Sequence, residues 1–175
     1  MNTGHLSYML ETAWTTLRGR LNGLTDDEFF WQPVPGGWTV HPLADGRWTV
    51  DYASPDPDPA PFTTIGWRLL HLASCKLMYH EYAFGPARLV WDDLPIPHTA
   101  AEAIAWLEEG QSLLRADLAG LTDADLERPV QTNWGETWPA WRIFWTMTEH
   151  DLHHGGEIGC LRDLYRLAYT PRLSC

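Results

Sequence analysis

Hydrophobic residues recur at steps of three and four along four separate stretches of the chain. Such spacing places the apolar side chains on one face of a helix, so that the helix can pack against a core. The four stretches cover about residues 6–24, 64–85, 99–120 and 139–167. Four amphipathic helices in 175 residues predict an all-α fold, a four-helix bundle, formed by a single domain over residues 1–175.

A short internal repeat follows the first and the third of these stretches. Residues 23–29 read GLTDDEF and residues 120–126 read GLTDADL. In each copy a glycine ends one helix, and Thr25 or Thr122 stands where it can cap the next turn. The repeat indicates a pseudo-symmetric bundle that is made of two helical pairs.

The stretch between the first two helices has a different pattern. Residues 33–61 lack helical spacing, and two runs of strand formers, 38–40 and 48–52, stand on either side of an Asp-Gly pair. This arrangement predicts a small hairpin within a long irregular loop. Alternating prolines then favour an extended connector. Because a loop of this length in a compact domain commonly forms a lid or one wall of a site, we expect an insertion of that kind at residues 33–61.

Composition restricts the partners and the location of the protein. The chain carries 23 acidic and 12 basic residues, a net charge of -11, which repels the phosphates of nucleic acids. It has no uncharged apolar run of about 18 residues, as a membrane-spanning helix requires. Its three cysteines include no CxxC pair, and its first residues lack a secretory pattern. These features predict a soluble cytoplasmic protein with no nucleic-acid partner and no membrane partner.

Tryptophan is unusually frequent, with 11 residues in the chain. Each indole offers a large apolar surface and one N–H donor, which suits a pocket for a small molecule with both apolar and polar parts. The alternative is that many of these rings simply fill space between helices. The candidates for pocket walls are Trp38, Trp67, Trp141 and Trp145, and a small-molecule substrate is the expected partner.

Candidate chemistry is concentrated in the fourth stretch, where residues 149–157 read EHDLHHGGE. His150 and His154 are four residues apart, so a helix places them one turn apart on the same face, where both can bind one metal ion. His153 points away from that face. Two imidazoles in an apolar stripe need polar partners, and the choice is between a metal ion and hydrogen bonds to carbonyls or carboxylates. The apolar members of the stripe are Ile143, Met147, Ile158, Leu161 and Tyr165.

A tight metal site needs a third ligand. The second predicted helix offers His71 near its middle. His80 on the same helix is the main rival, whereas His41 and His98 fall in predicted loops. Spacing alone leaves the identity of the third ligand open.

Two segments carry a resemblance to a known family. Residues 64–73, TIGWRLLHLA, and residues 150–158, HDLHHGGEI, resemble the histidine helices of the DinB-like superfamily of bacterial four-helix bundles, and the likeness covers nearly the whole chain. The resemblance implies a zinc or nickel ion bound by His71, His150 and His154, and it implies a homodimer. The family's fourth helix usually reads HHRGQ, whereas this chain reads HHGGE, with Glu157 in place of the glutamine.

Three neutral imidazoles leave coordination positions of a metal ion open, which is typical of catalytic or ligand-binding sites. The resemblance implies a thiol-dependent S-transferase or isomerase that uses a low-molecular-weight thiol, such as bacillithiol or mycothiol. Two alternatives stay open: a metal-dependent hydrolase or isomerase that needs no thiol, and a non-enzymatic module that binds a metal or a small molecule. Asp151 and Glu157 are the candidate catalytic residues, since either can orient an imidazole or act as a base.

Overall fold

The computed structural model describes residues 2–55 and 57–169. Within these residues the chain is largely helical, which confirms the predicted all-α class. The elements are α1 (Thr3–Leu21), α2 (Asp26–Phe30), β1 (Val40–Pro42), β2 (Trp48–Val50), α3 (Ile65–Ala83), η1 (Trp91–Asp93), α4 (Ala100–Ala119), η2 (Asp123–Glu127), β3 (Pro129–Gln131), β4 (Thr137–Pro139) and α5 (Ala140–Tyr169), where η marks a 3-10 helix.

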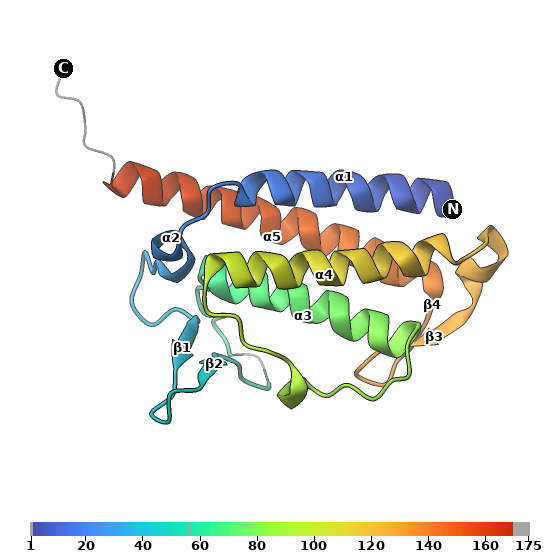
Figure 1. Ribbon diagram of the computed structural model, residues 1–175, viewed down its shortest axis with the longest axis horizontal. Helices are drawn as coiled ribbons and strands as arrows, with labels where there is room; N and C mark the ends of the chain where they lie inside the picture. The colour runs from blue at the N-terminus through green and yellow to red at the C-terminus, as the bar shows by residue number, and fades with distance from the viewer. Residues whose placement is uncertain (1, 56, 170–175) are drawn as a thin grey trace, which may run out of the picture.

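The long helices α1, α3, α4 and α5 form the bundle (Figure 1). α1 lies along α5 and α3 lies along α4, and α3 also packs against α5. Figure 1 shows α1 and α5 running in one direction and α3 and α4 in the other. The connection through η1 therefore returns along the length of the bundle before α4 begins. The predicted four-helix bundle is confirmed.

Hydroxyl side chains begin two of these helices at the expected positions. The Thr64 hydroxyl accepts a hydrogen bond from the N–H of Trp67 at the start of α3. Thr99 accepts one from the N–H of Glu102 at the start of α4, and Gly120 ends that helix. Each bond satisfies a backbone donor that has no partner within the first helical turn.

The internal repeat is visible in the fold. After α1, Thr25 forms a capping box with Glu28 and begins α2. After α4, Thr122 forms a capping box with Asp125 and begins η2. In both halves an antiparallel hairpin follows and leads into the next long helix, β1 with β2 before α3 and β3 with β4 before α5. The sequence predicts the β1–β2 hairpin from its Asp-Gly pair, but it does not predict the β3–β4 hairpin, because residues 129–139 contain no Asp-Gly or Asn-Gly pair.

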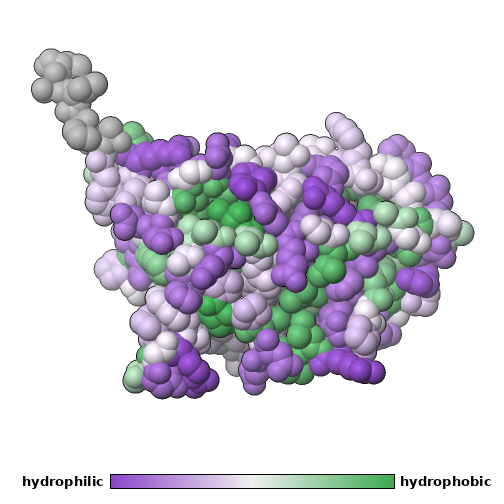
Figure 2. All heavy atoms as spheres, viewed as in Figure 1, coloured by the Kyte–Doolittle hydropathy of each residue, from purple (hydrophilic) through white to green (hydrophobic). Residues whose placement is uncertain are grey.

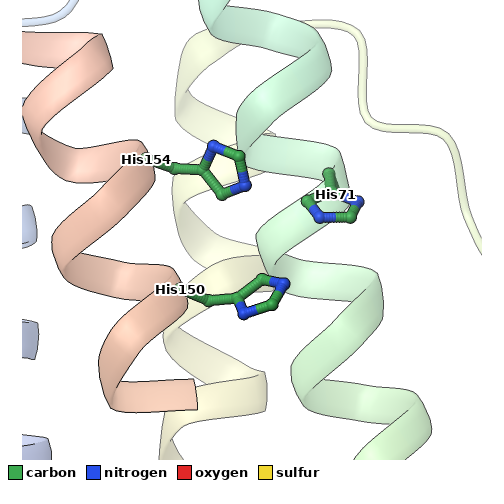
Figure 3. A group of neighbouring side chains, drawn as sticks. All are labelled: His71, His150 and His154. Carbon is green, nitrogen blue, oxygen red and sulfur yellow. The ribbon is translucent and has the colours of Figure 1, made fainter. Parts of the chain in front are cut away.

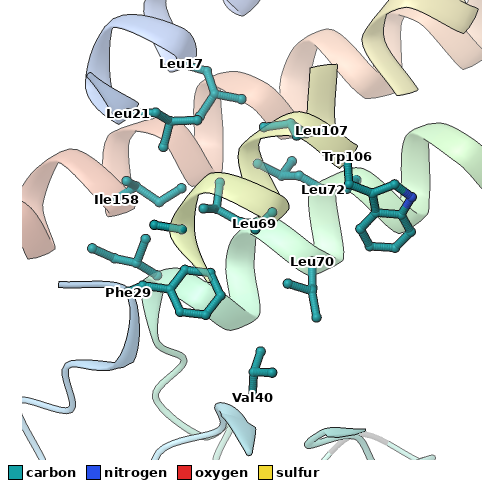
Figure 4. Close-up of a cluster of buried hydrophobic side chains, with 14 of the residues drawn as sticks. Leu17, Leu21, Phe29, Val40, Leu69, Leu70, Leu72, Trp106, Leu107 and Ile158 are labelled. Carbon is teal, nitrogen blue, oxygen red and sulfur yellow. The ribbon is translucent and has the colours of Figure 1, made fainter. Parts of the chain in front are cut away.

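A buried apolar cluster fastens α2 and the β1–β2 hairpin to the bundle. Phe29 of α2 and Val40 of β1 lie in the same cluster as leucines of α1, α3 and α4 (Figure 4). α2 packs so closely on α3 that a Cβ atom at Gly66 would lie 2.7 Å from the Phe29 ring. The insertion at residues 33–61 is therefore anchored next to the half of α3 that carries His71.

The surface is mixed in polarity. Figure 2 shows polar and charged side chains spread over the face drawn, with smaller apolar patches between them. Among the residues that the structure describes, no helix combines the length and the apolar character needed to cross a membrane.

Candidate metal centre

Three histidines converge where α3 packs against α5. His71 projects from α3 toward His150 and His154 of α5, as Figure 3 shows, and we refer to these residues as the histidine group. The His71 ring centroid lies 5.6 Å from that of His150 and 5.1 Å from that of His154, and one nitrogen of each ring lies within 4.8 Å of the other two. Ligand nitrogens on one tetrahedral ion lie about 3.3 Å apart. The three ring nitrogens are thus close enough together that one ion could be bound by all of them.

The α5 histidines lie at the border between the core and the solvent. Ile143, Met147 and Ile158, which share their helical stripe, are completely buried. The His150 and His154 side chains remain 27% and 15% exposed. The predicted face of the helix is therefore correct, and solvent reaches one side of the histidine group.

Hydrogen bonds determine which nitrogen of each α5 ring is free. Nδ1 of His150 lies 3.2 Å from the carbonyl oxygen of Thr146. Because a carbonyl only accepts, Nδ1 carries the proton and donates it, and Nε2 keeps a lone pair. Nδ1 of His154 lies 2.7 Å from Oε2 of Glu157 and donates in the same way. In both rings Nε2 is the nitrogen left to bind a metal ion.

Burial favours the neutral forms of His71 and His154. Burial, followed by the proximity of His154 and His150, lowers the pKa of His71 to about 3. Burial also lowers the pKa of His154, although the hydrogen bond to Glu157 opposes this change. Since metal ions bind the neutral imidazole, His71 and His154 have no proton to lose to the metal at neutral pH.

A second set of possible ligands overlaps the first. His153, His154 and Glu157 also bring one ligand atom each within 4.8 Å of one another. The His153 side chain, however, is 58% exposed. Oε2 of Glu157 already accepts hydrogen bonds from Arg68 and His154. The histidine group is the better candidate, because it offers three imidazoles with free nitrogens at a partly buried position.

Most of the chain matches one known family. Residues 9–158 match the family model of the DinB superfamily. The chain belongs to the DinB superfamily. A solved DinB-like protein from Bacillus cereus is similar to it, with a TM-score of 0.57 and 19% sequence identity over 89% of this chain and 90% of that chain. Similarity at this level of identity shows the fold alone. No curated protein matches the chain.

In this member of the DinB superfamily, Glu157 supports His154 from the side opposite to Nε2. Its Oε2 accepts a hydrogen bond from Nε of Arg68 at 2.9 Å in addition to the bond from His154. Burial acts to raise the pKa of Glu157, but the hydrogen bond from His154 and the charge of Arg68 together lower it below its ordinary value. The ionised carboxylate therefore orients the His154 ring and holds the proton on its Nδ1.

Asp151, the other predicted acid, lies on a different side of α5. One residue turns a helix by about 100°, which carries Asp151 from the direction of His150 into the core. Its side chain is completely buried, and its Oδ2 accepts a hydrogen bond from Nζ of Lys76 at 2.7 Å. Lys76 also donates to Oε1 of Gln111 at 2.9 Å. The structure places Asp151 in a buried ion pair and not in the histidine group.

The four candidate tryptophans separate into two pairs. The Trp67 ring stacks on His71 with centroids 5.0 Å apart and planes at 14°, and the Trp38 ring lies 5.8 Å from that of Trp67. Trp141 packs against a second buried apolar cluster, which includes Leu10, Leu114 and Phe144, and Trp145 is 43% exposed. Trp38 and Trp67 thus adjoin the histidine group, whereas Trp141 and Trp145 occupy other faces of α5.

Sequence reasoning missed three of the contacts that support the site. Arg68, which binds Glu157, is a charged residue in an otherwise apolar turn of α3, and that contrast is a signal that marks it. The carbonyl of Thr146 binds His150, and the carbonyl of Asp51 accepts from Nε1 of Trp67 at 2.7 Å. Backbone carbonyls leave no sequence signal, because every residue has one.

Cys75 lies beside His71 on α3 but is poorly suited to bind a metal. Its Sγ is 3.9 Å from both ring nitrogens of His71. Burial raises the pKa of the Cys75 thiol to about 12, and the thiolate, not the thiol, is the metal ligand. In the absence of a metal ion, Cys75 therefore offers a protonated thiol and not a thiolate.

Proposed function

We propose that the chain binds one zinc or nickel ion through the histidine group and there transfers a low-molecular-weight thiol to a small-molecule substrate. The observation that carries this proposal is the convergence of three imidazoles at a solvent-exposed edge of the core, with Nε2 of His150 and of His154 left free by the hydrogen bonds of Nδ1. Three protein ligands with an open position are typical of catalytic metal sites, whereas structural zinc sites fill all four positions. Imidazole suits both zinc and nickel.

The surrounding residues have defined roles in this proposal. Thr146 and Glu157 hold the Nδ1 protons of His150 and His154 and keep each Nε2 directed at the ion. Trp67 covers one face of the His71 ring and restricts the approach of water from that side. Trp38, next to Trp67, offers apolar surface to the substrate.

When bound, a divalent ion would lower the pKa of a thiol that occupies its open coordination position, so that the sulfur would be ionised at neutral pH. In the transfer, the sulfur forms a bond to an electrophilic carbon of the substrate. The leaving group departs with the bonding electrons, and the proton released by the thiol passes to solvent. The proposed step does not require Cys75, since its sulfur comes from the added thiol.

Cobalt substitution tests the proposal. Cobalt-loaded protein titrated with a low-molecular-weight thiol should develop a sulfur-to-metal charge-transfer band. The band should be lost in His150→Ala, which removes a ligand, and should persist in Cys75→Ser. If the wild-type protein shows no band at millimolar thiol, the transferase proposal fails and a hydrolase or isomerase that needs no thiol takes its place.

A different result would identify a closed site. A band that appears without added thiol and disappears in Cys75→Ser would make Cys75 the fourth ligand. The ion would then have four protein ligands, which is the pattern of structural sites, and a non-enzymatic metal-binding module would replace the enzyme.

A further inference from the structure

A pocket that is lined by residues of α2 and of the C-terminal part of α5 lies away from the histidine group. These two segments lie at the same end of the bundle (Figure 1). The volume of the pocket is about 570 Å³, which falls within the range of small-molecule pockets. Tyr165, which lines it, follows His154 along α5 by 11 residues, or about 16 Å of helix. We refer to it as the aromatic pocket, and it is independent of the proposed transferase site.

Aromatic rings form a large part of its lining. The rings of Trp31 and Tyr165 meet edge to face, with centroids 5.5 Å apart and planes at 82°. The Tyr165 ring also lies 4.6 Å from that of Tyr169. The faces of such rings carry partial negative charge and attract cations. Three rings in different orientations therefore favour a positively charged ligand.

Carboxylates add full negative charge to the same pocket. Asp26 and Asp27 both line it, and Oδ1 of Asp26 accepts a hydrogen bond from the N–H of Ala100 at 2.8 Å, which fixes its position. The adjacent Glu28 is neutralised by Arg162. Within the described part of the chain, neither Asp26 nor Asp27 forms an ion pair, and no lysine or arginine lines the pocket. The charge of these two carboxylates is thus available to a ligand.

We infer that the aromatic pocket binds a small organic cation that carries a quaternary or alkylated ammonium group. Such a group gains from the ring faces and from the carboxylates at once. A metal ion would need a shell of several oxygen ligands, which aromatic walls do not provide. An anion would be repelled by Asp26 and Asp27. The net charge of the chain, -11, also raises the local concentration of cations.

Proton NMR with choline as the probe tests this inference on the full chain. The N-methyl signals of choline should shift upfield and saturate, because they enter the shielding region above the rings. Trp31→Ala and Asp27→Asn should each weaken binding at least about threefold. Tyr169→Ala, at a side chain that is 63% exposed, should do the same without disturbing the fold.

Matched controls distinguish a specific cation site from nonspecific binding of choline to the protein surface. Trp134→Ala removes an exposed tryptophan elsewhere and should leave choline affinity unchanged, as should His150→Ala in the histidine group. The neutral isostere of choline, with carbon in place of nitrogen, should bind at least about threefold more weakly. Equal binding of the isostere, or unchanged affinity in both Asp27→Asn and Tyr169→Ala, would overturn the inference.

Discussion

Two polar clusters join α3 to α5 within a few residues of each other, and they differ in almost every physical respect. The histidine group is one of them. The other, which we call the lysine cluster, consists of Lys76, Asp151 and Gln111. The histidine group is partly exposed, and its α5 members keep Nε2 free to bind a ligand. Lys76 and Asp151 are completely buried and oppositely charged, and they bind each other.

The lysine cluster is enclosed on every side by the fold. Nζ of Lys76 lies 5.8 Å from the centre of the Trp14 ring, in addition to its two hydrogen bonds. α4 approaches so closely that a Cβ atom at Gly110 would lie 2.8 Å from Cβ of Lys76. Among the described residues, Nε2 of Gln111 and Oδ1 of Asp151 are the buried side-chain atoms without a partner.

The difference separates a structural role from a binding role on the same pair of helices. A buried ion pair adds little net stability, but it is costly to break, so it favours one way of packing the helices over others. The lysine cluster therefore holds α3 and α5 in the alignment that brings His71 opposite the α5 histidines. The histidine group, with lone pairs unused at the solvent border, is the part that is free to bind a ligand.

The largest effect should follow from breaking the lysine cluster. Lys76→Met leaves the Asp151 carboxylate buried without a counter-charge, which should lower the free energy of unfolding by about 3–5 kcal/mol. Urea denaturation measures this loss. The double variant Lys76→Met with Asp151→Leu removes both charges and should recover most of it, and it should still bind one metal ion. A loss below about 1 kcal/mol in the single variant would equate this pair with a surface salt bridge.

A smaller effect, on metal affinity, is expected at Glu157. Glu157→Ala frees the His154 ring to rotate and removes the acceptor for its Nδ1 proton, so the metal should bind about 10–100-fold more weakly. Glu157→Gln keeps an acceptor and loses only the charge, so its loss should be smaller. Competition with a chromophoric chelator gives the dissociation constants. Asp163→Ala removes an exposed acid from the same helix and serves as the control. Identical affinities for Glu157→Ala and Asp163→Ala would exclude a supporting role for Glu157.

Acid should destabilise the metal-free protein through the histidine group. The pKa of His71 is about 3 in the folded chain against an ordinary value of 6.5. Between these values the unfolded chain binds a proton that the folded chain does not. The free energy of unfolding should therefore fall as the pH is lowered from 6.5 toward 3, by at most about 1.4 kcal/mol per pH unit for this residue. Urea titrations at several pH values measure the slope, which should be flatter in His71→Phe. An equal slope in both proteins would assign the acid sensitivity to other groups.

Apolar spacing was sufficient to predict the long helices and two members of the histidine group. His150 and His154 were visible because they share one face of a single helix. The spacing does not identify His71 in the same way. α3 carries two histidines, and both are too far from α5 in the sequence for helical spacing to show which of them lies beside it. In the structure, Nδ1 of His80 lies 2.7 Å from Oδ2 of Asp117 on α4, whereas His71 lies beside the two histidines of α5. The resemblance to the DinB-like superfamily favours His71, because it implies a metal ligand at this position of the second helix. Residue spacing alone does not distinguish His71 from His80.

The lysine cluster shows where spacing alone was misleading. The sequence makes Asp151 a candidate because a carboxylate can orient an imidazole or act as a base. A second stripe of α5 is also buried, and Asp151 belongs to it, together with Phe144, Thr148, Gly155, Gly159 and Arg162. The buried face of α5 is thus wider than one stripe. The partner of Asp151 lies 75 residues earlier in the chain, and no local pattern connects the two.

The smallest effect is expected at His153, and it distinguishes the two possible sets of metal ligands. His154 belongs to both sets, so His154→Ala should abolish binding whichever set holds the ion. His71 belongs only to the histidine group, and His153 belongs only to the exposed set with Glu157. His153→Ala should therefore change the metal affinity by less than about twofold, as is usual for an exposed side chain. His71→Ala should remove stoichiometric binding, as elemental analysis of untagged protein would show. If His153→Ala loses the metal and His71→Ala keeps it, the ion is held on the exposed surface of α5, and the distinction between a binding cluster and a structural cluster on α3 and α5 no longer stands.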